Sequence, residues 1–126
     1  MTVTLNNILI VEDDFYIRDL YVRELERAKY MVRTADSVKQ GLEEIKKQKP
    51  NLIMLDIMLP IRSGLELLEE VKKDKNLADI KIVILSNLGE DDIIKQGFAK
   101  GADGYLIKSS HTPKQVLVEI ERYLTK

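Results

Sequence analysis

The amino-acid sequence predicts a doubly wound α/β fold, with a five-stranded parallel sheet in the order 2-1-3-4-5 and five helices on its two faces. Five short apolar runs alternate with five segments whose apolar residues recur at helical spacing. This alternation requires right-handed crossovers and a parallel sheet that is covered on both sides. The second run alternates between apolar and polar residues, as an edge strand does, and therefore favours the stated strand order.

The first expected strand, Leu5 to Val11, holds a continuous apolar run and stops at three consecutive acids. A helix is expected from Phe15 to Lys29, because its apolar residues have helical spacing and the preceding acids favour its positive N-terminal end. Met31 to Ala35 is the expected edge strand. Ser37 then opens the second helix, and Gln40, three residues later, completes the pattern of a capping box.

Leu52 to Asp56 reads as a third strand, in which four apolar residues between polar flanks are buried on both faces and are followed by a single acid. Ser63 and Glu66 repeat the capping-box pattern and open the third helix. The fourth expected strand, Ile80 to Leu85, is fully apolar at its end and stops at Ser86.

The fourth helix, from about Asp91 to Lys100, is expected to be the least secure. It carries Gly97 in its interior, at a cost of about 1 kcal/mol relative to alanine. Tyr105 to Ile107 forms a short fifth strand that stops at Lys108. Thr112, followed by a proline at the first helical position and a glutamine two residues further on, opens the fifth helix.

Composition excludes several classes of protein. The 126 residues are expected to form one domain, residues 1–126, and the 20 basic and 21 acidic residues are mixed along the chain. A net charge of -1 argues against the basic stripe of a nucleic-acid interface. The chain has no cysteine, no apolar run of membrane-spanning length and no basic start of a signal peptide. We therefore expect a soluble, cytoplasmic protein that binds neither nucleic acid nor membrane.

Polar residues end four of the expected strands at one edge of the sheet. In the flavodoxin-like order 2-1-3-4-5, ligands bind between the carboxyl ends of strands one and three. Glu12, Asp13 and Asp56 should converge there, flanked by Ser86 and Lys108. Each alone is explained as a cap, a turn residue or a solvated lysine. These separate explanations would require five polar side chains to meet at one edge of the sheet by chance, and a shared function explains them better.

Three crowded carboxylates repel one another, so we expect a hard divalent ion, Mg²⁺, to neutralise them. Asp56 is then a nucleophile that forms an acyl phosphate. Lys108 supplies a positive charge for a phosphoryl oxygen, and the Ser86 hydroxyl can donate a hydrogen bond to another. These roles amount to acceptance of a phosphoryl group by Asp56.

The motifs resemble those of the response-regulator receiver domains of two-component signalling, from about Asn7 to Leu124. The resemblance rests on the apolar run before Glu12-Asp13-Asp14, Leu55-Asp56 through Pro60 to Gly64, Leu85-Ser86, and Gly101 to Lys108. It implies that Asp56 accepts a phosphoryl group from the phosphohistidine of a sensor histidine kinase or a phosphotransfer protein. It also implies that Asp13, Asp56 and the Met58 main-chain carbonyl hold Mg²⁺, with Glu12 acting through water.

The same resemblance assigns the switch residues. It implies that the Ser86 hydroxyl moves toward the phosphoryl group and that the Tyr105 ring turns inward. This remodels the face made by the fourth helix, fifth strand and fifth helix, where an unknown output partner binds. The protein would then be a signalling domain, not an enzyme with a separate substrate, either monomeric or dimeric in a phosphorylation-linked way.

Four residues bear on how closely the chain follows the family pattern. Ser109 stands where the family has a proline after a cis bond, and a cis bond before a non-proline residue costs about 2.5 to 4 kcal/mol. We therefore expect a trans Lys108–Ser109 bond or visible strain. Asn87 stands where a small residue is usual. Met58 and Leu88 cannot act as bases, so we expect a long-lived acyl phosphate.

Other functions fit the sequence less well. The principal alternative is a receiver-like interaction module that switches without phosphorylation, suggested by Asn87 and Ser109. A phosphohydrolase of the haloacid-dehalogenase kind needs a second acid where Met58 stands. A flavodoxin-like flavin binder needs a phosphate-cradling loop after the first strand, where three acids would repel the phosphate.

Overall fold

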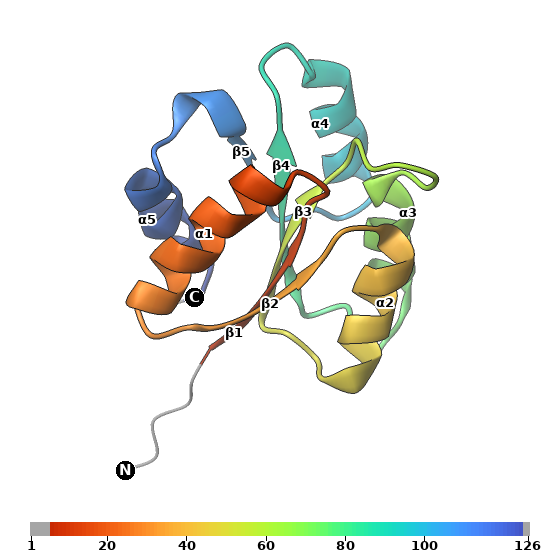
Figure 1. Cartoon of the computed structure of the whole chain (residues 1–126). Helices are drawn as coiled ribbons and strands as arrows, with labels where there is room; N and C mark the ends of the chain where they lie inside the picture. The colour runs from red at the N-terminus through yellow and green to blue at the C-terminus, as the bar shows by residue number, and fades with distance from the viewer. Residues whose placement is uncertain (1–5, 125–126) are drawn as a thin grey trace.

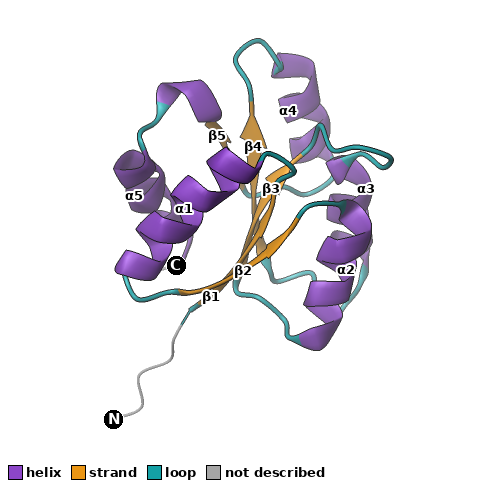
Figure 2. Ribbon diagram, in the orientation of Figure 1, coloured by secondary structure: helices purple, strands orange, loops and turns teal. Residues whose placement is uncertain are grey.

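The computed structural model describes residues 6–124 and shows a central sheet between two layers of helices (Figures 1 and 2). The strand order is β2-β1-β3-β4-β5, and every neighbouring pair is parallel. The predicted fold class and strand order are therefore confirmed.

The strands of this sheet are β1 (Asn7–Val11), β2 (Met31–Ala35), β3 (Leu52–Asp56), β4 (Lys81–Ser86) and β5 (Gly104–Ile107). The helices are α1 (Phe15–Arg27), α2 (Val38–Lys47), α3 (Gly64–Lys73), α4 (Asp91–Ala99) and α5 (Pro113–Leu124). A short 3-10 turn, η1 (Lys108–Ser110), connects β5 to α5.

The predicted bounds differ from these at a few element ends. The expected start of the first strand, Leu5, lies outside the described residues. Helix α1 ends at Arg27, before the expected Lys29, because Lys29 adopts a left-handed φ of 75° that no helix can continue. No peptide bond within residues 6–124 is cis, so the Lys108–Ser109 bond is trans, one of the two expected outcomes.

Strands β1 and β3 are buried along their whole length, whereas most of β2 is exposed or half-buried. This is the burial expected of two central strands and one edge strand. Over the part of the chain that the structure describes, no helix has the length and apolar character needed to cross a bilayer.

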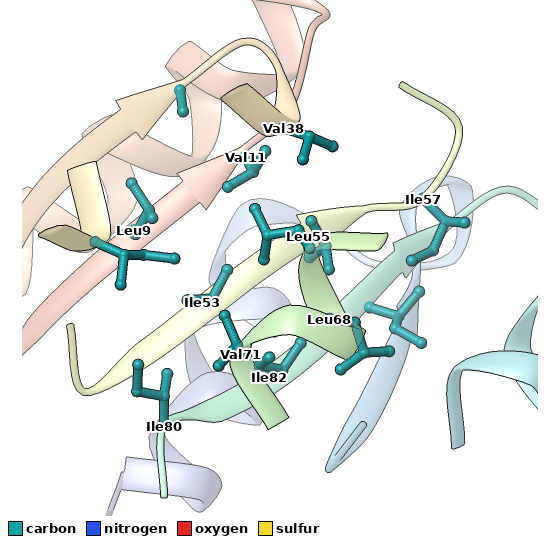
Figure 3. Close-up of a cluster of buried hydrophobic side chains, with 14 residues drawn as sticks. Leu9, Val11, Val38, Ile53, Leu55, Ile57, Leu68, Val71, Ile80 and Ile82 are labelled. Carbon is teal, nitrogen blue, oxygen red and sulfur yellow. The ribbon is translucent and has the colours of Figure 1, made fainter. Parts of the chain in front are cut away.

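Side chains that alternate along the strands divide the core into two layers. One layer lies under α2 and α3, and part of it is drawn in Figure 3. Its strand residues are Leu9, Val11, Ala35, Ile53, Leu55, Ile82 and Ile84. The other layer lies under α1 and α5. Its strand residues are Ile8, Ile10, Leu52, Met54, Val83, Leu85 and Leu106. In Figure 1, α1 and α5 accordingly cover one face of the sheet, and α2, α3 and α4 cover the other.

Two of the predicted capping boxes bring their side chains to the helix start. Thr112 Oγ1 accepts the N–H of Gln115 at 3.2 Å, and Gln115 Oε1 accepts the N–H of Thr112 at 2.8 Å. Ser37 Oγ accepts the N–H of Gln40 at 3.1 Å, but the Gln40 amide oxygen binds the N–H of Asp36, one residue earlier than expected. In both pairs the hydroxyl therefore satisfies a main-chain donor that the helix leaves free.

The capping box predicted at Ser63 and Glu66 is wrong in its second half. Ser63 Oγ accepts the N–H of Leu65 at 3.1 Å and does cap α3. The Glu66 carboxylate is instead 3.1 Å from Arg62 Nε. A guanidinium one residue before the cap competes for this carboxylate, because a charged donor makes the stronger hydrogen bond.

Gly97 has a packing role that its helix propensity does not reveal. A Cβ atom at this position would lie 2.1 Å from Ile84 Cδ1 of β4. Glycine therefore permits the close approach of α4 to the sheet, in addition to lowering the intrinsic stability of the helix.

Candidate functional site

The carboxyl ends of four strands bring the candidate residues to one edge of the sheet. Val11 of β1 is in register with Leu55 of β3, so the residues that follow them, Glu12 and Asp56, come to neighbouring positions. The register of β4 with β5 likewise brings Ser86 level with Ile107, the residue before Lys108. Parallel pairing is what places these chain segments side by side.

Burial distinguishes this edge from the rest of the molecule. Among the described residues, four polar or charged side chains are buried, and three of them lie here: Glu12 is 1%, Asp56 4% and Ser86 1% exposed. Asp13 lies at the exposed mouth of the site. One carboxylate oxygen from each of Glu12, Asp13 and Asp56 falls within 4.8 Å of the others. Buried acids at such separations are costly unless a cation offsets their charge.

Lys108 provides one such cation. Its Nζ lies 2.6 Å from Glu12 Oε2 and 3.2 Å from Asp56 Oδ2. Burial by itself favours the neutral amine, but the hydrogen bond to Glu12 and the charges of both carboxylates outweigh it and raise the pKa of Lys108. Lys108 is therefore a fixed positive charge between the two acids.

Glu12 carries the clearest sign of crowded negative charge. Burial, above all, and the neighbouring charge of Asp56 raise the pKa of Glu12 to about 7, against the lowering effects of Lys108 and the Asp14 N–H. The Asp14 N–H donates to Glu12 Oε1 at 3.1 Å, and the Arg18 guanidinium donates to the Glu12 carbonyl at 2.8 Å. One ammonium is therefore insufficient for three carboxylates, and a further cation would relieve the remaining repulsion.

The loop after β3 folds back tightly against Asp56. Asp56 Oδ1 accepts the N–H of Met58 at 3.0 Å, and the Gly64 N–H donates to the Ile57 carbonyl at 2.8 Å. A Cβ atom on Gly64 would lie 2.3 Å from the Asp56 carbonyl oxygen. Only glycine fits this approach of backbone to backbone, which gives a physical reason for the glycine in the Asp56 motif.

Ser86 and Tyr105 occupy different surroundings. The Ser86 hydroxyl donates a long hydrogen bond, 3.4 Å, to the Leu106 carbonyl. The Tyr105 ring is 45% exposed and packs edge-on against Phe98 of α4, with 6.0 Å between ring centroids. The structure thus brings Ser86 to the edge with the carboxylates, while Tyr105 lies on the surface between β5 and α4.

Two residues near the site were missed by the sequence analysis. Tyr21 of α1 is buried, which raises the pKa of its phenol, and it also experiences the charges of Lys108, Glu12 and Asp56. Arg18, one turn earlier, binds the Glu12 carbonyl. Both lie in the segment that the sequence analysis predicts as a helix from its apolar spacing, and no local signal in the sequence indicates that α1 lies against the carboxylates.

The carboxylate oxygens of this site come from the ends of two strands, and their negative charge is incompletely neutralised. Oxygen ligands of this kind are the donors that Mg²⁺ prefers. Comparison with known sequences identifies the family of the chain. The chain matches the family model of the response regulator receiver domain over residues 8–121. The phosphate regulon transcriptional regulatory protein PhoB of Pseudomonas aeruginosa is 38% identical over 119 residues, which cover 94% of this chain and 52% of that protein. The chemotaxis protein CheY of Halobacterium salinarum is 31% identical over 106 residues, which cover 84% of this chain and 87% of CheY.

The chain therefore spans about half the length of the PhoB relative.

Solved structures show the same architecture. A putative response regulator from Chloroflexus aurantiacus superimposes with a TM-score of 0.91 at 28% identity, over 98% of this chain and 100% of that one. The chemotaxis response regulator CheY4 of Vibrio cholerae superimposes with a TM-score of 0.88 at 27% identity, over 95% of this chain and 99% of that one. Through this match of sequence and fold, the chain belongs to the response regulator receiver domain family of two-component systems.

Proposed function

We propose that the chain is a phosphoacceptor domain in which Asp56 takes a phosphoryl group from a phosphohistidine of a sensor histidine kinase or phosphotransfer protein. The observation that carries this proposal is the Lys108 ammonium, held 2.6 Å from Glu12 and 3.2 Å from Asp56 at the buried carboxyl edge of the sheet. An Asp56 oxygen forms a bond to phosphorus while the bond from phosphorus to the donor imidazole breaks and the imidazole keeps the electron pair. The product is an acyl phosphate on Asp56.

We propose that Mg²⁺ is held by the carboxylates of Glu12, Asp13 and Asp56 and by the Met58 main-chain carbonyl. Glu12 would act through water. Three carboxylate oxygens within 4.8 Å of one another and the raised pKa of Glu12 support this assignment. When bound, the ion supplies positive charge against the repulsion between the Asp56 carboxylate and the incoming phosphoryl oxygens.

The chain's own residues complete the acceptance of the phosphoryl group. Lys108 already lies at Asp56 Oδ2 and can pair with an oxygen of a phosphoryl group bound to Asp56. The Ser86 hydroxyl gives up only a long hydrogen bond to Leu106 when it turns toward the phosphoryl group. We propose that the ring of Tyr105, which is half-exposed here, turns inward into the space that this movement would leave.

The consequence is a change of surface rather than turnover of a substrate. We propose that the inward movement of Tyr105 remodels the face made by α4, β5 and α5, and that an output protein or domain, or a second copy of the chain, binds that face. Residues 1–126 would act as one such domain in the cytoplasm. The balanced charge of the chain supports a protein partner in preference to nucleic acid.

Intact mass after incubation with acetyl phosphate and Mg²⁺ tests the proposal. The wild type should gain one phosphoryl group, and Asp56→Ala should gain none. Asp92→Asn, which changes an exposed acid at the start of α4, is the matched control and should behave as the wild type does. Equal labelling of Asp56→Ala would remove Asp56 as the acceptor.

A wild type that takes no phosphoryl group from acetyl phosphate or from phosphoramidate, whose phosphorus–nitrogen bond resembles that of phosphohistidine, would contradict the proposal. It would favour the alternative, an interaction module that switches without phosphorylation.

A further inference from the structure

Ile61, in the loop between β3 and α3, combines two features that do not help the chain to fold. Its φ is 71°, in the left-handed region that β-branched residues rarely occupy. Its side chain is 100% exposed. Of the described non-glycine residues, only Lys29 shares a positive φ, and Lys29 lies two residues after the end of α1, directly after its C-cap residue. Ile61 therefore has an unfavourable backbone conformation, and burial of its side chain within the chain does not compensate for it. A residue of this kind suggests a role in binding another molecule.

A groove of about 250 Å³ lies beside Ile61. It is lined by Ser37, Val38 and Lys39 at the start of α2 and by Pro60, Ile61 and Arg62 of the loop. We call it the Ile61 groove. Aliphatic and proline side chains form half of this lining, so the groove suits an apolar side chain. None of its residues belongs to the carboxylate cluster at Asp56.

The charge at the Ile61 groove is positive. Lys39 is exposed and takes part in no ion pair within residues 6–124. Arg62, the other cation, is already neutralised by Glu66 at 3.1 Å and Glu70 at 2.9 Å. No acid lines the groove. Lys39 is therefore an uncompensated cation next to an apolar depression, and it is complementary to a carboxylate.

We propose that the Ile61 groove is a docking site for a segment of a partner protein that presents an apolar side chain beside a carboxylate. The apolar side chain packs against Ile61 and Pro60, and the carboxylate pairs with Lys39. The exposed isoleucine then gains the burial that it lacks in the free chain. None of the residues that line the groove is among those proposed to take part in phosphoryl transfer at Asp56, so this proposal can be tested separately from the proposed function.

Two matched peptides test this docking site. Acetyl-Leu-Glu-amide and acetyl-Leu-Lys-amide are titrated separately into ¹⁵N-labelled chain, and backbone amide shifts are followed. The glutamate peptide should shift the amides of Val38, Lys39 and Ile61 and should bind about two- to fivefold more tightly than the lysine peptide, the range of an exposed ion pair.

Three variants separate charge from shape. Lys39→Glu should reverse the preference between the two peptides. Ile61→Gly should weaken both peptides, because it removes apolar surface and relieves the backbone. Lys46→Glu, which changes an exposed lysine of α2 that does not line the groove, is the matched control and should leave the preference as in the wild type.

Several results would overturn the proposal. Equal affinity for the two peptides, or shifts centred away from the groove, would show that no such recognition exists. Groove amides that shift with protein concentration in the absence of peptide, and that stop doing so in Ile61→Gly, would show that a second copy of the chain is the occupant.

Discussion

At the scale of single residues, Lys108 determines the electrostatics of the candidate site. Three carboxylates share its neighbourhood, two of them buried, and it contacts both of the buried ones. A buried ion pair is not necessarily stabilising relative to apolar residues, but removal of one partner leaves a buried charge uncompensated.

Lys108→Met should accordingly destabilise the chain in metal-free buffer. We expect the free energy of unfolding to fall by roughly 3 kcal/mol, because Glu12 and Asp56 then face each other without a cation. Urea denaturation in the presence of EDTA measures this. Lys114→Met, at an exposed position of α5, should change it by less than about 0.5 kcal/mol. Equal stabilities of the two variants would show that the ion pairs at Lys108 do not hold the site together.

Ile61 gives a second prediction at this scale. Ile61→Gly should raise the free energy of unfolding by roughly 1 kcal/mol, since glycine adopts a positive φ without strain and no packed side chain is lost. Ile61→Ala keeps a Cβ atom and should recover much less. Thermal and urea denaturation compare the three proteins. A glycine variant less stable than the wild type would mean that the isoleucine contributes to folding after all.

At the scale of secondary-structure elements, the contact between α4 and β4 is set by Gly97. The missing Cβ lets the helix approach Ile84 more closely than any other residue would allow. Helix propensity and packing therefore pull in opposite directions at this position: alanine would favour the helix by about 1 kcal/mol and would clash with the strand.

Gly97→Ala should therefore destabilise the chain, by about 1 kcal/mol net, although it improves helix propensity. Ile84→Val removes the Cδ1 atom that the new methyl group would meet. In that background the cost of Gly97→Ala should disappear or reverse, and a double-mutant cycle should give a coupling energy of about 1 kcal/mol. Additive effects of the two changes would rule out this contact as the reason for glycine.

A second link between elements joins the α1–β2 connection to α5. The Tyr30 hydroxyl donates to Glu121 Oε2 at 2.8 Å. Burial, and then the hydrogen bond and charge of Glu121, raise the pKa of Tyr30 from 10.0 to about 12. The folded state therefore favours the protonated phenol.

The sign of the resulting pH dependence follows from linkage. The contribution of Tyr30 to stability should be complete below pH 10 and should be lost as the pH rises from 10 to about 12. The difference in free energy of unfolding between the wild type and Tyr30→Phe, measured by urea denaturation across this range, should shrink with rising pH. A difference that stays constant would mean that the phenol titrates alike in the folded and unfolded chain.

At the scale of the whole molecule, the candidate Mg²⁺ ligands come together only when β1 and β3 pair. Glu12 and Asp13 follow β1, and Asp56 ends β3, so the unfolded chain has no preformed site. A ligand that binds only the folded state raises stability in proportion to the logarithm of its concentration above Kd.

Excess Mg²⁺ should therefore raise the Tm by a few degrees over the value in EDTA, as expected for a stabilisation of about 1 kcal/mol or more. Asp13→Asn should be at least as stable as the wild type in EDTA, because one repelling carboxylate is gone, but should lose most of the response to Mg²⁺. Differential scanning calorimetry measures both, with NaCl at matched ionic strength as the control. An identical rise with NaCl, or in Asp13→Asn, would exclude these carboxylates as the magnesium ligands.

Much of the architecture could be predicted from local patterns along the chain. The order of the elements follows from five apolar runs, of which Leu52 to Asp56 is one. The segments between these runs have apolar residues at helical spacing. Crossovers between parallel strands are right-handed, and Met31 to Ala35 has the pattern of an edge strand. These two constraints leave few possible sheet topologies. In that topology β1 and β3 are adjacent parallel strands. Asp56 is the last residue of β3 and Glu12 directly follows β1, so the two residues become neighbours.

Other features needed the folded chain. Glu66 was assigned to a capping box from its spacing, but the guanidinium of Arg62 takes its carboxylate. Gly97 was read as a weak point of a helix, and Ile84 of another element shows it to be a packing position. Tyr21 looked like an ordinary helix residue until the fold placed it within the field of Lys108.

The sequence by itself determined the fold class, the strand order and the acids that meet at the sheet edge, because hydrophobic periodicity and capping depend on residues close together in the chain. Tertiary structure alone decided that Lys108 lies between two buried carboxylates, that Ile61 is left exposed in a left-handed conformation, and which carboxylate each cation takes. These outcomes depend on distances between residues far apart in the chain, and such distances exist only once the two core layers have closed on the sheet.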